Sequence, residues 1–217
     1  MEEKYKIVYS GGSDEIVEKK SRFIATVMPV ESEEQALAFI EGLRKKYWDA
    51  THNCYAYVVG RRNETARCSD DGEPAQTAGR PMLDVLLGEG VHNTAVVVTR
   101  YFGGTLLGTG GLVRAFSKAV QAGLAASVVV TKEPCYKVTI NSDYNALGKI
   151  QYIAGTMSLK MLESIYTEAV QSVWLAPAGQ KDGFIKKVTE ATSGQAKLEI
   201  SDMCFAAFTE KDVILFE

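Results

Sequence analysis

The feature that most constrains the fold of this chain is an apolar strand followed directly by glycines and then by a helical pattern. Residues 94–101 (TAVVVTRY) are the strongest predicted strand, because β-branched and aromatic residues dominate them. Five glycines follow, namely Gly103, Gly104, Gly108, Gly110 and Gly111. Apolar residues at helical spacing then predict a helix from Leu112 to about Ala126. The glycines therefore lie where a strand gives way to a helix.

The residues before this unit predict a mixture of strands and helices. Short strands are expected at residues 6–9, 15–18, 23–30 and 54–59. Ser32 and Gln35 form a capping box that starts a helix running to about Trp48. Residues 61–80 show no apolar periodicity and are expected to be a loop of about twenty residues, a length at which loops tend to be functional. A short helix at residues 81–87 should follow.

A second, complete pattern begins after the sequence TKEP at residues 131–134. It reads strand 136–141, helix 144–154, strands 158–166 and 168–175, helix 180–192 and strand 196–208. This β-α-β-β-α-β order is that of the split-βαβ, or ferredoxin-like, module. We therefore predict an α+β protein with domains at residues 1–132 and 133–217.

Composition excludes several functional classes. The chain has 217 residues, a formal net charge of -3 and a pI near 5.6, so it lacks the overall basicity of many nonspecific nucleic-acid binders. No apolar run approaches the roughly 18 to 20 residues that span a bilayer, and the acidic N-terminus does not resemble a signal peptide. The four widely spaced cysteines favour reduced thiols. We expect a cytoplasmic protein with no membrane partner.

The glycine loop is the clearest chemical signal. A loop that opens a helix presents unpaired N–H groups and the positive end of the helix dipole, and glycines allow an anion to come close. Gly103 and Gly108 have the separation of a Walker motif, but Thr109 replaces the required Lys. Arg100 and Arg114 flank the loop and favour a polyanion site, with tight turns alone as the alternative role of the glycines.

Acidic residues form a second candidate site. Asp70, Asp71 and Glu73 could act as acid, base or ligands of a divalent cation, or could only form an Asx turn and a helix cap. His52 and Cys54 lack the paired cysteines of a zinc site, so no metal site is predicted, and His52 either lines the site or makes a local hydrogen bond.

Two aromatic residues end the main strand. Tyr101 and Phe102 could stack on a base or pack against the domain.

Four segments together resemble the YigZ/IMPACT family: KKSRFIA (residues 19–25), HNCYAYVVG (52–60), SDDGEPAQTAGRPML (69–83) and VVVTRYFGGTLLGTGGLVRAFS (96–117). The resemblance covers nearly the whole chain. It implies a first domain similar to the second domain of a small-subunit ribosomal protein and to domain IV of elongation factor G. It implies a ferredoxin-like second domain, similar to another elongation-factor module.

The resemblance also implies a shared site. This site would combine the acidic loop, the turn containing Thr77 and Gly79, and the corner from Arg100 to Gly104. Eukaryotic relatives restrain a translation-initiation-factor kinase, but use an extra N-terminal domain. Small-molecule kinases of the same superfamily bind phosphate at a glycine-rich helix start, yet the loop spacing here departs from theirs, and no cofactor is expected.

These observations leave three functional hypotheses. The leading one is a binder of RNA or the ribosome in translation or its regulation, which contacts phosphate through Arg100, Arg114 and the glycines and stacks a base on Tyr101 or Phe102. The alternative is an enzyme acting on a phosphorylated or acidic small molecule through Asp70, Asp71 or Glu73. The third is a protein-interaction module that uses the second domain. The sequence does not indicate an oligomeric state.

Overall fold

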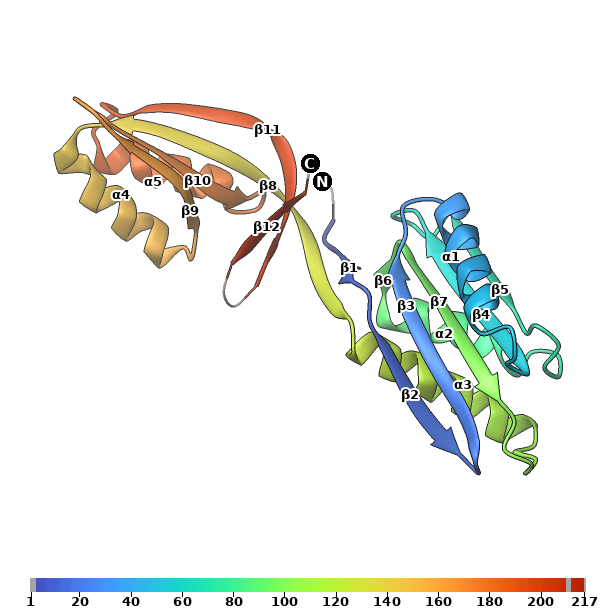
Figure 1. The fold of residues 1–217 in the computed structure, drawn as a ribbon. Helices are drawn as coiled ribbons and strands as arrows, with labels where there is room; N and C mark the ends of the chain where they lie inside the picture. The colour runs from blue at the N-terminus through green and yellow to red at the C-terminus, as the bar shows by residue number, and fades with distance from the viewer. Residues whose placement is uncertain (1–2, 210–211, 217) are drawn as a thin grey trace. The chain divides into compact units, whose positions relative to one another are not determined.

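The computed structural model of the protein describes residues 3–209 and 212–216, which fall into two compact units (Figure 1). One unit comprises Tyr5–Thr131, and the other comprises the chain from Lys132 onward together with the N-terminal segment up to Lys4. Each unit contains both helices and strands. The structure thus confirms the predicted α+β class with two domains.

The first unit is built on one antiparallel sheet with the strand order β2-β3-β7-β4-β5. Its strands are β2 (Ser13–Glu18), β3 (Ser21–Pro29), β4 (His52–Val59), β5 (Thr65–Ser69) and β7 (Thr94–Tyr101). A short parallel pair, β1 (Tyr5–Ser10) with β6 (Val91–His92), belongs to the same unit. The glycine loop follows β7, so the middle strand of the sheet leads into the candidate site.

Helices cover both faces of this sheet (Figure 1). Helix α1 (Glu33–Lys46) packs on one face, and α2 (Gly79–Glu89) and α3 (Thr109–Ala125) pack on the other. Successive residues of β7 alternate between the faces: Val97 contacts the α1 side, and Val98 the opposite side. This double cover explains why β7 reads as an unbroken apolar run.

The start of α1 is at the predicted N-cap, Ser32, and one half of the predicted capping box forms. The hydroxyl of Ser32 accepts a hydrogen bond from the backbone N–H of Gln35 at 3.3 Å, and the Gln35 side chain accepts one from the backbone N–H of Glu31 at 2.8 Å. The first bond satisfies an N–H group that the helix leaves unpaired, whereas the second reaches one residue beyond the N–H of Ser32 that a capping box would engage.

The expected loop at residues 61–80 is only partly a loop, and that prediction was wrong. Residues 65–69 form β5, which pairs with β4 as an edge strand from Thr65 opposite Val59 to Ser69 opposite Tyr55. Its side chains are polar or half-buried, so it has no apolar periodicity to recognise. Backbone pairing to β4, which the sequence pattern does not display, makes it a strand.

The second unit contains one further sheet and two helices. Its elements are the part of β8 (Val128–Ser142) from Lys132 onward, α4 (Tyr144–Thr156), β9 (Lys160–Tyr166), β10 (Val170–Pro177), α5 (Lys181–Ala191), β11 (Lys197–Phe208) and β12 (Val213–Phe216). The strand order is β9-β10-β8-β11-β12, with antiparallel neighbours. Ile140, Ile150 and Phe184 are fully buried where the helices pack on the sheet.

The β-α-β-β-α-β order of this unit agrees with the sequence pattern, and two details correct it. β12 was not predicted, and the first strand is longer than the predicted 136–141, because β8 already begins at Val128 and runs through residues 131–134. Pro134 is compatible with that strand because it lies opposite Phe205 and its carbonyl accepts a bond from the N–H of Ala178. The likeness to the ferredoxin-like module stays a prediction.

None of the helices in the described part of the chain is long and apolar enough to cross a membrane.

We expect the core of the first unit to depend on the contact between Phe23 and Phe116. Both side chains are fully buried, and their rings meet edge to face with centres 5.2 Å apart. Phe116→Ala should lower the free energy of unfolding by about 3–5 kcal/mol, measured by urea denaturation, because it leaves a cavity. Trp48→Ala is the control. Because Trp48 is 83% exposed, this substitution should lower the free energy of unfolding by no more than about 0.5 kcal/mol. Equal effects of the two substitutions would contradict this packing.

Candidate functional site

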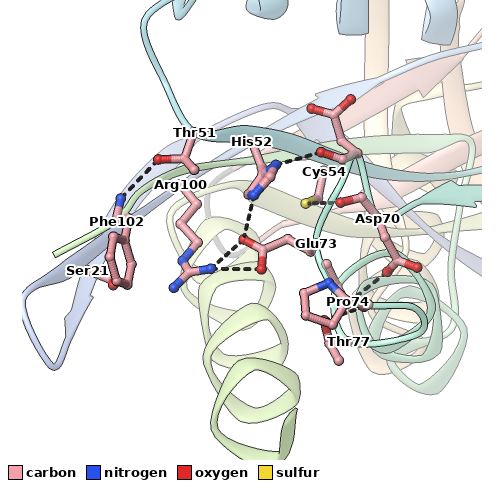
Figure 2. Close-up of polar contacts among 12 residues, drawn as sticks. Ser21, Thr51, His52, Cys54, Asp70, Glu73, Pro74, Thr77, Arg100 and Phe102 are labelled. Atoms are coloured by element: carbon pink, nitrogen blue, oxygen red, sulfur yellow. Dashed lines mark hydrogen bonds and ion pairs between the residues drawn. The ribbon is translucent and has the colours of Figure 1, made fainter. Parts of the chain in front are cut away.

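Three segments meet where β7 ends, and they form the candidate site (Figure 2). The turn before β4 contributes Thr51, whose N–H donates to the carbonyl of Arg100 at 2.9 Å and whose hydroxyl accepts from the N–H of Phe102 at 3.1 Å. The acidic loop joins them, because Nδ1 of His52 lies 2.7 Å from the carbonyl oxygen of Asp71. The structure therefore brings together the predicted acidic loop and the strand end.

The centre of the site is a buried ion pair between Arg100 and Glu73. The Nη1 atom of Arg100 lies 2.6 Å and 2.7 Å from the two carboxylate oxygens of Glu73. The side chain of Arg100 is 7% exposed and that of Glu73 only 1%. The Nε2 atom of His52 lies 3.8 Å from the same carboxylate. Neither charged group can face bulk water, so each depends on the other for compensation.

Asp70 holds the acidic loop in shape. One carboxylate oxygen accepts hydrogen bonds from the N–H groups of Ala78 at 3.0 Å and Gly79 at 2.8 Å. The other accepts from the N–H of Gln76 at 2.8 Å. These are the first backbone groups of α2 and the turn that leads into it. Asp70 thus acts as the turn and cap residue that was the alternative to catalysis.

Asp71 is also engaged within the protein. Its carboxylate accepts from the guanidinium of Arg44 at 2.9 Å and from the N–H of Asn53 at 2.7 Å. Its φ of 45° is left-handed, a conformation that Asp tolerates better than most residues. Asp71 therefore connects the loop to α1 and β4.

Thr77 and Gly79 lie inside the loop, away from solvent. The hydroxyl of Thr77, which is 1% exposed, donates to the carbonyl of Pro74 at 2.7 Å. A Cβ atom on Gly79 would lie 2.6 Å from the backbone of Ser69, so only glycine permits this approach. These two residues shape the site without reaching its surface.

The corner after β7 packs on the turn between β2 and β3. The N–H of Gly103 donates to the hydroxyl of Ser21 at 3.1 Å, and a Cβ atom at Gly103 would overlap the backbone of Lys20. Gly104 and Gly108 have positive φ values of 82° and 72°. The first glycines of the loop are therefore required by backbone geometry.

The start of α3 has a different character. Gly108 occupies the N-cap position without any side-chain hydrogen bond, and the first turn contains no acidic residue. Thr109 and Gly110 are exposed, and so is Arg114, one turn further along. The Nη1 atom of Arg114 lies 3.5 Å from the position of a Cβ atom on Gly110. Gly111 instead packs against Leu107. The helix start thus presents N–H groups and a guanidinium to solvent.

Tyr101 and Phe102 do not form one aromatic surface. The Tyr101 hydroxyl donates to the carboxylate of Asp49 at 2.9 Å, and the guanidinium of Arg22 lies 5.4 Å from its ring centre. Phe102 lies beside Arg100, 5.6 Å from ring centre to guanidinium, and is 46% exposed. Because neighbouring residues of a strand face opposite sides, only Phe102 adjoins the buried ion pair.

Several contact residues of the site were not predicted, including Ser21, Arg44, Thr51 and Asn53. Ser21 carried a usable signal in the sequence, because it is a polar residue that continues the alternation of Phe23, Ala25 and Val27. The structure shows that all four side chains point inward and that Ser21 is fully buried. Arg44 and Thr51 carried none, since their partners come from distant segments. Within the described residues, no group of three or more His, Cys, Asp and Glu side chains is placed to hold a metal ion.

The cysteines near the site are unreactive in character. All four cysteines are free, Cys54 is buried and Cys68 is exposed. Burial, followed by the charge of Glu73, raises the pKa of the Cys54 thiol well above its usual range. Burial and then Asp70 raise the pKa of the Cys68 thiol, as expected for a thiol beside the acidic loop.

Comparison with known proteins now identifies the family. The Impact N-terminal domain matches residues 19–124, and a domain of unknown function, DUF1949, matches residues 140–195. The IMPACT family member YvyE of Bacillus subtilis is 38% identical over 201 residues, which is 93% of each chain. The chain belongs to the IMPACT family. A second relative, YigZ of Escherichia coli, is also 38% identical, over 83% of this chain and 89% of its own.

A solved structure extends this comparison to the fold. The crystal structure of a hypothetical protein, 36% identical, aligns over 91% of this chain and 97% of its own with a TM-score of 0.58. The IMPACT domain match includes every predicted site residue of the first unit, from His52 to Arg114.

Removing the carboxylate of Asp70 should destabilise the first unit. Asp70→Ala deletes three hydrogen bonds to backbone N–H groups, so we expect a loss of about 2 kcal/mol or more in urea denaturation. Asp84→Ala is the matched control, because Asp84 makes an exposed i,i+4 ion pair with Arg80. This substitution should lower the free energy of unfolding by less than about 0.5 kcal/mol. If Asp70→Ala were as stable as the control, Asp70 would not be the residue that shapes the loop.

Thiol labelling should distinguish Cys68 from Cys54. At about pH 8, iodoacetamide should modify Cys68 first, yet more slowly than it modifies a free thiol such as glutathione, because the raised pKa leaves less thiolate. Modification of Cys54 should require unfolding. Mass spectrometry of the labelled peptides over time would test this, and fast labelling of Cys54 in the native protein would contradict its burial.

Proposed function

We propose that this protein binds RNA, free or within the ribosome, in translation or its regulation, and that it contacts phosphate at the start of α3. The resemblance to the IMPACT family supports the link to translation through the elongation-factor-like domains that it implies, whereas the restraint of a translation-initiation-factor kinase is a role of eukaryotic relatives and is not proposed for this protein. The predicted likenesses of residues 1–132 to ribosomal-protein and elongation-factor-G domains, and of residues 133–217 to a ferredoxin-like module, point the same way.

The observation that carries this proposal is the uncapped start of α3. A helix of 17 residues that begins at Thr109 after the N-cap Gly108, with no side-chain cap and no acid in its first turn, leaves N–H groups for an external anion. The exposed guanidinium of Arg114 adds a full positive charge one turn along. Glycines at 108 and 110 keep side chains out of the approach.

The buried ion pair changes the role that the sequence suggested for Arg100. A guanidinium that is 7% exposed and bonded to Glu73 is not available to a long phosphate backbone. In this proposal Arg114 is therefore the main contact to phosphate. Phe102, whose ring is about half exposed, stacks on a base. Tyr101, bonded to Asp49, takes no part.

The geometry favours binding over catalysis. The carboxylate oxygens of the three acidic residues already make hydrogen bonds or an ion pair within the protein, in Asp70, Asp71 and Glu73 alike. An enzyme using any of them would first have to break these contacts. The enzymatic alternative therefore has no geometric observation in its favour.

Reversing the charge of Arg114 should weaken RNA binding. We expect Arg114→Glu to lower affinity for ribosomes and for structured RNA, and to reduce the slope of log affinity against log salt by about one or more. Fluorescence anisotropy and ribosome co-sedimentation across a salt series would measure both effects.

The matched control is Lys187→Glu, which makes the same change in net charge at an exposed position of α5 in the second unit. Equal loss in both variants would indicate a general charge effect. Salt-independent binding, or no binding by the unaltered protein, would refute the proposal.

A further inference from the structure

Arg100 is a buried side chain of the site whose hydrogen-bonding capacity the described residues leave largely unused. It is the last inward-facing residue of β7, following Val96 and Val98 on the face that α2 and α3 cover. Both oxygens of Glu73 bind the single nitrogen Nη1. The Nε atom is fully buried and has no partner among the described residues, and none of them bonds to Nη2 either.

This arrangement differs from the usual guanidinium–carboxylate pair. An ionised carboxylate commonly accepts two parallel N–H bonds from two nitrogens. Here the carboxylate binds one corner of the guanidinium, and the Nε/Nη2 edge, whose two N–H donors are parallel, has no hydrogen-bond partner among the described residues. An unpaired buried donor costs about 1–3 kcal/mol, so an open edge in a side chain that is 7% exposed requires a reason.

Two aromatic rings hold that edge in place. The guanidinium carbon lies 5.4 Å from the ring centre of Phe23 and 5.6 Å from that of Phe102. Phe23 is fixed in the core against Phe116 of α3, so the guanidinium lies beside this helix, as Figure 2 shows. With its plane fixed by rings and one corner fixed by Glu73, the free edge is preorganised for a partner.

Resting on the function proposed above, we infer that the Nε/Nη2 edge of Arg100 is a receptor for a terminal phosphate group. Two adjacent phosphate oxygens match the two parallel donors. An internal phosphodiester carries a sugar on either side and cannot approach a side chain that is nine-tenths buried, whereas a phosphomonoester presents three free oxygens at the end of the molecule. The exposed ring of Phe102 then lies beside the phosphate, where the terminal base can stack.

Glu73 sets the charge of this receptor. Its carboxylate neutralises Arg100, so the edge binds a phosphate mainly through directed hydrogen bonds, and repulsion between Glu73 and the phosphate limits the affinity. The start of α3 and Arg114 supply the remaining positive potential. The two partners of the ion pair should therefore affect phosphate binding in opposite directions.

The test compares short single-stranded RNAs that carry a phosphate at the 5′ end, at the 3′ end or at neither end, by fluorescence anisotropy at constant ionic strength. We expect the protein to bind one phosphorylated form about tenfold more tightly than the hydroxyl form. Arg100→Lys keeps the charge but removes the edge, and should reduce this ratio to less than about twofold. Glu73→Gln should raise affinity for the phosphorylated RNA, and melting curves of both variants check that they fold.

The outcomes separate this inference from the proposed function. Equal binding of all three RNAs, with salt-dependent binding lost in Arg114→Glu, would overturn the phosphate receptor and leave the RNA proposal intact. Inorganic phosphate or a nucleoside monophosphate serves as the probe for a small-molecule source of the same chemistry. Saturable binding of that probe, lost in Arg100→Lys and without any RNA binding, would support the receptor and refute the RNA proposal.

Discussion

The buried ion pair between Arg100 and Glu73 is the interaction on which the rest of the site depends. Removing two charges from water costs several kcal/mol. The pair is stable only because the surrounding residues hold both side chains at hydrogen-bonding distance from each other. Arg100 is held by the centre of the sheet, and Glu73 by a loop that Asp70 and Asp71 anchor. Breaking any one anchor would release a buried charge, which explains why so many polar residues of a surface loop point inward.

The glycines of the site fall into two physical classes. Gly79 and Gly103 allow backbone segments to approach closer than a Cβ atom permits, and so belong to the architecture. Gly108 and Gly110 meet no such neighbour apart from the Arg114 side chain, and they open the first turn of α3 to solvent. The glycine-rich pattern therefore combines a structural corner with an open helix start.

The two arginines that appeared equivalent in the sequence have different roles. Arg114 lies on the exposed side of α3 and suits a long, flexible polyanion through charge alone. Arg100 lies beside Phe23, Phe102 and Glu73, and the proposed role of its free N–H groups is to donate directional hydrogen bonds to a single end group. The two proposals therefore assign to the first unit a general electrostatic contact at Arg114 and a narrow, specific contact at Arg100.

Periodicity and turn chemistry were sufficient to predict most elements. The boundaries of β7, the start of α1 after Ser32 and the β-α-β-β-α-β order of the second unit all follow from local residue patterns. Such patterns act over a few residues, which is why they missed β5, an edge strand defined by pairing with β4. Local residue patterns also predicted that most of the candidate site lies between Ser69 and Arg114.

The sequence by itself determined which residues are charged, which favour backbone turns and which are apolar enough to pack in a core. Only the tertiary structure decided which of them face water. Strand alternation and the sheet register place Arg100 opposite Phe23 and His52, inside the unit, while Tyr101 faces the other side. The physical reason is that burial and pairing of a charge depend on segments far apart in the chain, here β7 and the loop that carries Glu73, and no local pattern records their meeting.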